Sequence, residues 1–224
     1  LVTPSKEIGW LKEFAKGLRL FTRTYQVPII GGDLVKGKEC SVSVGVCGEV
    51  SSNQFLPRHG AKKGDSIFVS GTLGIAKLGL KLIKSKKKNL NSVEKKYCNK
   101  FLKPKVQTEL GKNLRGIANS CIDISDGLIG DLGHICQRSK LGARIYVDSI
   151  PCEGSFKDAL TWGDDYELCF TVSKNKEAKL DGILKRLKIK KFKIGEITKD
   201  HGIKIFQGAK EIHLNRKSYN HLSS

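Results

Sequence analysis

Hydrophobic and polar positions along the chain switch between helical and strand-like spacing, which predicts a mixed α/β to α+β fold. Residues 5–25 place apolar side chains on one helical face, so an amphipathic helix is expected there. A β-branched run at 27–30 and alternating valines within 41–50 predict two strands. Further strands are expected at 66–70, 144–150, 168–172, 192–197 and 203–206, and further helices from 71 through 82, over 106–118, after 127 and over 175–187.

The segment 122–127 (IDISDG) joins a β-branched strand to a helix through a turn with two carboxylates, Asp123 and Asp126. In open α/β folds, chemistry is presented at the C-terminal ends of strands. A Mg²⁺ ion takes one or two carboxylates together with substrate phosphates. In the alternative interpretation, Asp126 only caps the helix and Asp123 is solvated. This stretch alone does not decide between a metal site and a cap.

Two more acidic turns adjoin predicted strands: Gly31-Gly32-Asp33 follows the strand at 27–30, and Gly163-Asp164-Asp165 precedes the strand at 168–172. We expect one negatively charged pocket that suits phosphate bound through Mg²⁺, together with glycine turns and Arg58. The chain lacks a Walker A motif, a kinase-type glycine loop and a GxSxG nucleophile elbow. The residues themselves therefore predict a metal-dependent enzyme that handles phosphate. The carboxylates of this pocket are Asp33, Asp123, Asp126, Asp164 and Asp165.

Composition narrows the class of protein. The chain has 224 residues, 39% hydrophobic and 28% charged, which is typical of a soluble globular protein with one large or two small domains. Its seven cysteines form no CxxC pair, which favours buried thiols in a reducing cytoplasm over zinc or disulfides. The N-terminus lacks a signal-peptide pattern and the chain has no methionine, so we expect it to begin partway into a longer protein.

The net charge of +19 raises a nucleic-acid partner as an alternative. Much of this charge is local, because residues 81–105 hold ten lysines against one acid, Glu94. Few aromatic residues are interleaved to stack on bases. A solvated lysine-rich surface of loop and helix is the default interpretation, and nucleic-acid binding is the less favoured one.

Five segments, taken together, resemble the thiamine-monophosphate kinases, a family of the aminoimidazole-ribonucleotide-synthetase-like superfamily. The resemblance covers nearly the whole chain, and five motifs in the same order are far more specific than any one of them. The segments are Gly31-Gly32-Asp33, Arg58 with 60–65 (GAKKGD), 70–74 (SGTLG), 123–128 (DISDGL) with 131–134 (DLGH), and 163–168 (GDDYEL).

The resemblance implies a fold, a reaction and a set of site residues. It implies transfer of a phosphoryl group from ATP to thiamine phosphate, with Mg²⁺ as cofactor and a homodimer in the full-length protein. The fold it implies is the remaining part of an N-terminal α/β domain at 1–52 and a C-terminal α+β domain at 53–224. By position in the family motifs, the Mg²⁺ ligands are Asp33, Asp123 and Asp126, the ATP contacts are Gly32, Asp33, Arg58 and Ser125, and the contacts to the thiamine substrate are Asp164 and Tyr219.

Departures from the family pattern concern the substrate pocket more than the metal site. Trp162 stands where the family usually has glycine, so its ring either narrows the pocket or packs outward. Ile75 stands where an acid often follows the GTLG turn. Further metal ligands belong to an N-terminal part of the family that precedes Leu1. The alternative within the superfamily is a selenophosphate- or purine-pathway synthetase, and the residues single out no catalytic group beyond the metal and substrate contacts.

Overall fold

The computed structural model describes residues 1–4, 8–52 and 54–214, which form parts of two compact units, Leu1–Glu49 and Val50–Ser224. In the first unit, β1 (Val2–Thr3) pairs in parallel with β2 (Val35–Lys36). Helix α1 (Ile8–Tyr25) confirms the predicted helix from Ile8 onward, and none of its residues is buried within the described chain. No helix in the described parts is long and apolar enough to cross a membrane.

The two strands predicted in this unit are wrong. Residues 27–30 carry no strand, and at 41–50 the only pairing among the described residues is a bridge between Ser41 and Val2. A strand forms only where a neighbouring backbone accepts and donates its hydrogen bonds. Apart from that bridge, β1 and β2 are the only strands that pair in the described part of this unit. The apolar side chains of both runs are exposed, as at Ile30 and Val46.

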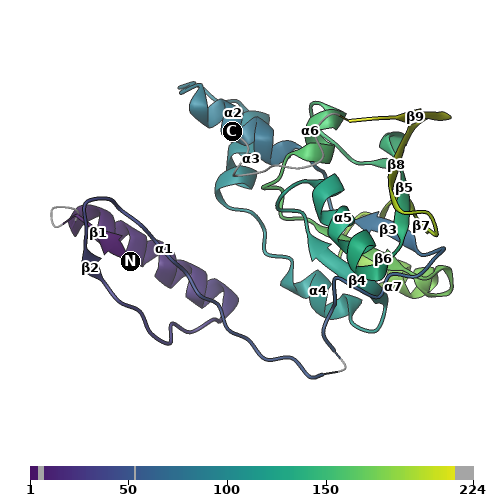
Figure 1. Cartoon of the computed structure of the whole chain (residues 1–224). Helices are drawn as coiled ribbons and strands as arrows, with labels where there is room; N and C mark the ends of the chain where they lie inside the picture. The colour runs from purple at the N-terminus through teal and green to yellow at the C-terminus, as the bar shows by residue number, and fades with distance from the viewer. Residues whose placement is uncertain (5–7, 53, 215–224) are drawn as a thin grey trace. The chain divides into compact units, whose positions relative to one another are not determined.

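The second unit is built around a seven-stranded sheet in the order β4-β6-β3-β7-β5-β8-β9 (Figure 1). Its neighbouring strands are antiparallel except for β5 and β8, which run in parallel. The mixed helix and sheet architecture that the sequence predicts is thereby confirmed. The strands are β3 (Ser66–Val69), β4 (Ala118–Asp123), β5 (Gly142–Tyr146), β6 (Leu168–Val172), β7 (Phe192–Thr198), β8 (Gly202–Gln207) and β9 (Lys210–Ile212).

Helices cover both faces of this sheet. One hydrophobic cluster joins one face to α5 and α6, and a second joins the other face to α4 and α7. Strand β3 shows why two clusters form, because successive side chains point to opposite faces. Ile67 and Val69 belong to the first cluster and Phe68 to the second. The helices are α2 (Ile75–Lys84), α3 (Ser92–Leu102), α4 (Thr108–Leu114), α5 (Leu128–Ser139), α6 (Phe156–Thr161) and α7 (Glu177–Arg186), with single 3₁₀ turns at Val147–Ser149 and Lys174–Lys176.

The lysine-rich segment forms most of a helical hairpin, α2 and α3, which confirms a surface of loop and helix. Asn91 and Glu94 form a capping box at the start of α3. The two helices approach so closely that a Cβ on Gly79 would lie 2.2 Å from the carbonyl oxygen of Tyr97. Three predicted boundaries shift: α2 begins only at Ile75, α4 ends at Leu114 before a left-handed Gly116, and β5 ends at Tyr146 before a 3₁₀ turn.

Truncating the core under α5 tests this packing. Leu132 is fully buried in the first cluster, so Leu132→Ala removes apolar contacts and leaves a cavity. We expect it to lower the free energy of unfolding by about 2–5 kcal/mol in urea denaturation. Val93→Ala on α3, where the side chain is half exposed, is the control and should change it by less than about 0.5 kcal/mol. Equal effects of the two substitutions would contradict the assignment of Leu132 to the core.

Candidate functional site

The turns after β4 and before β6 lie side by side because the pairing of these strands continues beyond their ends. Asp123 pairs with Leu168 in the antiparallel ladder. Past that point, the Ile124 amide donates to the Glu167 carbonyl (2.7 Å), and the Tyr166 amide donates to the Ile124 carbonyl (2.9 Å). The Asp164 amide then donates to the carbonyl of Ser125 (3.0 Å). Two acidic turns that are 40 residues apart in sequence therefore meet at one place.

The turn at 163–166 contains backbone conformations that few residue types adopt. Asp164 and Tyr166 both have positive φ angles, 66° and 48°. A bulky residue such as tyrosine rarely adopts this region, and such outliers concentrate at functional sites. Gly163 has no room for a side chain, because a Cβ there would lie 1.7 Å from the Ser125 carbonyl oxygen. Glycine before the acidic pair is thus required by contact with the neighbouring turn.

The charges of three carboxylates act on the Tyr166 side chain. Burial and the charges of Asp164, Asp123 and Asp126 together raise the pKa of the Tyr166 hydroxyl, with burial as the largest cause. Asp123 and Asp126 are half-buried, and among the described residues neither forms an ion pair with a lysine or arginine. Half-buried carboxylates held close together without cations favour the binding of a positively charged group.

These residues fit one wall of a Mg²⁺ site. Carboxylate oxygens are the ligands that Mg²⁺ prefers, and Asp123 and Asp126 supply them from the same turn. Within the described chain, however, no group of three or more Asp, Glu, His or Cys side chains is arranged to hold a metal ion. A Mg²⁺ ion at Asp123 and Asp126 therefore needs further oxygens, which phosphates of a bound nucleotide provide in many enzymes.

Asp131 is a residue to which the sequence interpretation gave no role. It is buried in the first turn of α5 and accepts the amides of Ser125 and Asp126, both at 3.0 Å. Burial raises the pKa of its carboxyl group to about 6, an effect partly opposed by the hydrogen bond from the Asp126 amide. Asp131 thus fixes the turn that carries Asp126. An aspartate in the first turn of a helix, where backbone amides lack partners, is the sequence feature that could have indicated this role.

Asp165 does not join the acidic site, which corrects the prediction that all five aspartates share one pocket. Its carboxylate is fully buried and accepts the amides of Gly74 (2.7 Å) and Ala76 (3.1 Å) at the start of α2. These amides have no partner within the helix, so Asp165 satisfies them. The second carboxylate of the pair therefore supports the fold, while Asp164 is the member beside Tyr166.

Glu167, two residues further along, is held in the same way. Its buried carboxylate accepts hydrogen bonds from Ser70 Oγ (2.5 Å) and Gln107 Nε2 (2.8 Å), and it forms an ion pair with Lys100 of α3. A Cβ on Gly71 would overlap this carboxylate at 2.6 Å. One lysine of the lysine-rich segment is therefore neutralised inside the protein, next to the acidic turn.

Trp162 packs against helix α2 rather than into the pocket described below. The ammonium group of Lys77 lies 4.5 Å from the centre of the Trp162 ring and 2.6 Å from a carboxylate oxygen of Asp158. This stacking of a cation on an aromatic face favours the packed position of the ring. Ile75, the other departure from the family pattern, is buried as the first residue of α2.

The remaining predicted site residues belong to other segments of the chain. Arg58 is exposed in the loop before β3, next to Pro57, whose carbonyl accepts the amide of Cys121 in β4 (2.9 Å). Gly32 and Asp33 are exposed in the first unit, where the Asp33 carboxylate accepts the amide of Leu34 (2.8 Å). Tyr219 lies outside the described residues.

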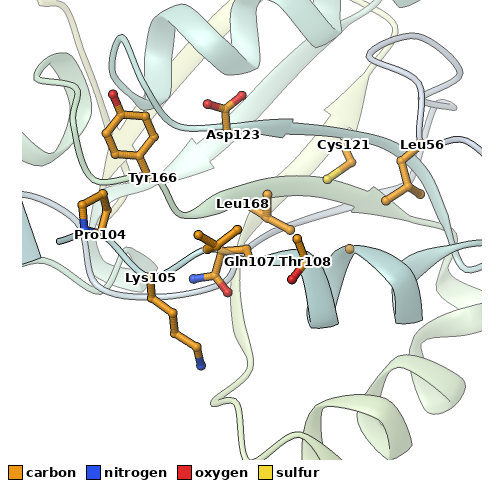
Figure 2. A pocket seen from close by; sticks show the side chains of 11 residues that line it. Leu56, Pro104, Lys105, Gln107, Thr108, Cys121, Asp123, Tyr166 and Leu168 are labelled. Carbon is orange, nitrogen blue, oxygen red and sulfur yellow. The ribbon is translucent and has the colours of Figure 1, made fainter. Parts of the chain in front are cut away.

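A pocket of about 390 Å³ adjoins the acidic turns on the α4 side of the sheet. Asp123 and Tyr166 line one side, and Figure 2 shows the Tyr166 ring near Pro104, in the segment that leads into α4. The pocket is lined by Leu56, Pro104, Lys105, Val106, Gln107, Thr108, Gly111, Cys121, Asp123, Tyr166 and Leu168. A molecule bound at the acidic turns could thus extend into a space with mainly apolar walls.

Comparison with known proteins identifies relatives along the whole chain. Residues 62–207 match the C-terminal domain of AIR synthase related proteins, and residues 1–50 match their N-terminal domain. The thiamine-monophosphate kinase of Buchnera aphidicola subsp. Schizaphis graminum is 39% identical over 99% of this chain and 72% of its own length.

Solved structures share the fold. The thiamine-monophosphate kinase of Stenotrophomonas maltophilia superimposes with a TM-score of 0.81 at 30% identity, over 92% of this chain and 69% of that protein. AaThiL complexed with AMPPCP and TMP superimposes with a TM-score of 0.78 at 24% identity, over 97% of this chain and 71% of that one. The predicted fold class is confirmed by these family models and structures.

The close contact at Gly163 can be tested by adding one methyl group. Gly163→Ala places a Cβ against the Ser125 carbonyl, so the two turns must separate. We expect the free energy of unfolding to fall by about 1–3 kcal/mol in urea denaturation. Gly182→Ala in α7 is the matched control; its Cβ meets nothing within 4 Å and should stabilise the helix by up to about 1 kcal/mol. Unchanged stability of Gly163→Ala would contradict the contact.

The buried carboxyl group of Asp165 predicts a pH dependence. Burial raises its pKa from 3.8 to about 6, although the amides of Gly74 and Ala76 oppose the shift. The folded protein therefore binds more protons than the unfolded chain between these values, and stability falls as pH rises through this range. We expect the stability of the wild type relative to Asp165→Asn to fall by ~2 kcal/mol from about pH 4 to pH 7. A difference in unfolding free energy that stays constant with pH would contradict this.

Proposed function

Because this chain belongs to the thiamine-monophosphate kinase family, we propose that it transfers the γ-phosphoryl group of ATP to thiamine monophosphate, yielding thiamine diphosphate. The observation that carries the proposal is the junction of the turns at 123–126 and 163–166, the motifs at which the family resemblance places metal and substrate contacts. Relatives that are 33–39% identical over most of the chain carry the name of this activity.

Phosphoryl transfer depends on positioning and charge neutralisation more than on covalent catalysis by the protein. We assign Mg²⁺ binding to Asp123 and Asp126 of the second unit and to Asp33 of the first. When bound, Mg²⁺ would neutralise charge on the phosphate oxygens. Ser125, at the tip of the first turn, is assigned to the nucleotide. Asp164, on the opposite turn, is assigned to the acceptor substrate.

Other assignments follow from the family resemblance. Arg58 and Gly32 are proposed to contact ATP; an arginine can present paired N–H groups to phosphate oxygens. Tyr219 is proposed as a second contact to the acceptor. We further propose that the full-length protein is a cytoplasmic homodimer.

Substituting one carboxylate tests the metal assignment. Asp123→Asn keeps the size of the side chain but removes its charge, so we expect Mg²⁺-dependent formation of thiamine diphosphate to fall at least about 100-fold. Product is measured by chromatography across a Mg²⁺ titration. Asp200→Asn, at an exposed residue paired with Lys204, is the control and should retain wild-type turnover. A wild type that forms no thiamine diphosphate, or an Asp123→Asn variant with unchanged Mg²⁺ dependence, would sink the proposal.

A further inference from the structure

The loop that carries Arg58 lies against β4, a strand at the edge of the sheet. The Pro57 carbonyl accepts the amide of Cys121 in this strand (2.9 Å). Further along the loop, Gly60 packs on Asn119, since a Cβ on Gly60 would lie 2.8 Å from the Asn119 carbonyl oxygen. The loop and the strand therefore run in opposite directions, and Arg58 lies between two points at which the loop is held.

This placement brings Arg58 near the acidic turn that follows β4. Cys121 precedes Asp123 by two residues, a distance of about 7 Å along a strand. Arg58 is exposed and forms no ion pair with any of the described residues. Its long side chain is thus available to present paired N–H groups to phosphate oxygens of a nucleotide at this turn.

One buried carboxylate ties the end of the loop to β4. Asp65 Oδ2 accepts the amide of Lys62 (2.9 Å) and the side-chain amide of Asn119 (2.8 Å). Asp65 Oδ1 accepts the hydroxyl of Ser173 (3.0 Å), which in turn accepts a second hydrogen bond from the Asn119 amide (2.7 Å). Asp65 therefore fixes both the end of the loop and the residue on which Gly60 packs.

We propose that Asp65 and Asn119 are positioning residues that hold the Arg58 guanidinium where it meets the phosphates of ATP at the acidic turns. The inference rests on the proposed function, which assigns Arg58 to the nucleotide. Asp65 and Asn119 act through the backbone of the loop. The loop keeps one position because its displacement would leave buried donors without partners. A misplacement of about 1 Å is enough to weaken a contact to a reacting group strongly.

Removing the Asn119 side chain tests the link between the carboxylate and the loop. Asn119→Ala deletes the amide that joins Asp65 to the Gly60 side of the loop, but keeps the bond from the Lys62 amide. We expect the KM for ATP to rise at least about fivefold and the KM for thiamine monophosphate to stay within about twofold. The Kd for AMPPCP, measured by isothermal titration calorimetry with Mg²⁺, should rise at least about fivefold as well.

A double-mutant cycle separates positioning of Arg58 from a general loss of stability. If Asn119 acts through Arg58, adding Asn119→Ala to Arg58→Ala changes the Kd for AMPPCP by less than about twofold. A loss of affinity that does not pass through Arg58 would have the same size in both backgrounds.

Ser66→Ala is the matched control, because it removes a buried hydrogen bond next to Asp65 that does not involve the loop. The Ser66 hydroxyl donates to Glu177 of α7 (2.6 Å). We expect this variant to bind AMPPCP within about twofold of the wild type. Thermal unfolding of each variant establishes that it is folded.

A second substitution keeps the inference testable if Asn119→Ala does not fold. Asp65→Asn keeps the size of the side chain but leaves one oxygen to accept from three donors, those of Lys62, Asn119 and Ser173. We expect it to raise the Kd for AMPPCP at least about threefold, again only when Arg58 is present.

The inference is overturned if folded Asn119→Ala and Asp65→Asn both bind AMPPCP like the wild type, or if their effect is the same with and without Arg58. A wild type that does not bind AMPPCP overturns it too. Turnover distinguishes it from the proposed function. Formation of thiamine diphosphate with an equal KM for ATP in the wild type and in folded Asn119→Ala removes the positioning role and leaves the kinase. The expected AMPPCP pattern without any product from the wild type removes the kinase and leaves the positioning role.

Discussion

The hydrogen-bonded continuation of β4 and β6 beyond the sheet is the constraint on which the candidate site depends. Three backbone bonds, between Ile124 and Glu167, Tyr166 and Ile124, and Asp164 and Ser125, hold two carboxylate-bearing turns together. Carboxylates repel each other, so side chains alone would separate these turns. The backbone bonds oppose that repulsion because neither turn can move without leaving buried polar groups unpaired. Charge density at the site is thus maintained by the sheet.

Acidic residues around this junction divide into two groups by what they contact. Asp131, Asp165 and Glu167 are buried and accept hydrogen bonds from amides or side chains, so they hold the backbone in place. Asp123 and Asp126 are only half-buried; Asp123 lines the pocket, and the charges of both act on Tyr166. The first group is satisfied within the protein, whereas the second is suited to a ligand. The burial of each carboxylate and its hydrogen-bond partners, more than the type of residue, distinguish the two groups.

The sequence predicts the arrangement well where the signal is local. The strand, turn and helix around 122–127 and the strand predicted at 66–70 follow from the pattern of apolar residues, and both are confirmed. The strands expected at 27–30 and 41–50 are wrong, because alternation shows which side chains share a face but not whether a neighbouring strand exists. Likewise, Asp164 and Asp165 are adjacent and chemically identical in sequence. Only the register of the turn decides which one caps α2.

Alternate residues of the segment 164–167 attach it to the helical hairpin of α2 and α3, and this also affects how the second unit unfolds locally. Asp165 is bonded to the start of α2, and Glu167 is paired with Lys100 of α3, so the helical hairpin is attached to the acidic turn at two points. Regions joined by buried bonds tend to unfold as contiguous cooperative units. Detachment of the hairpin would expose both carboxylates and remove one of the two supports of the turn that carries Asp164 and Tyr166, leaving the backbone bonds to the turn after β4. We therefore expect opening of the hairpin to lower the protection of the amides in this wall of the site from solvent exchange.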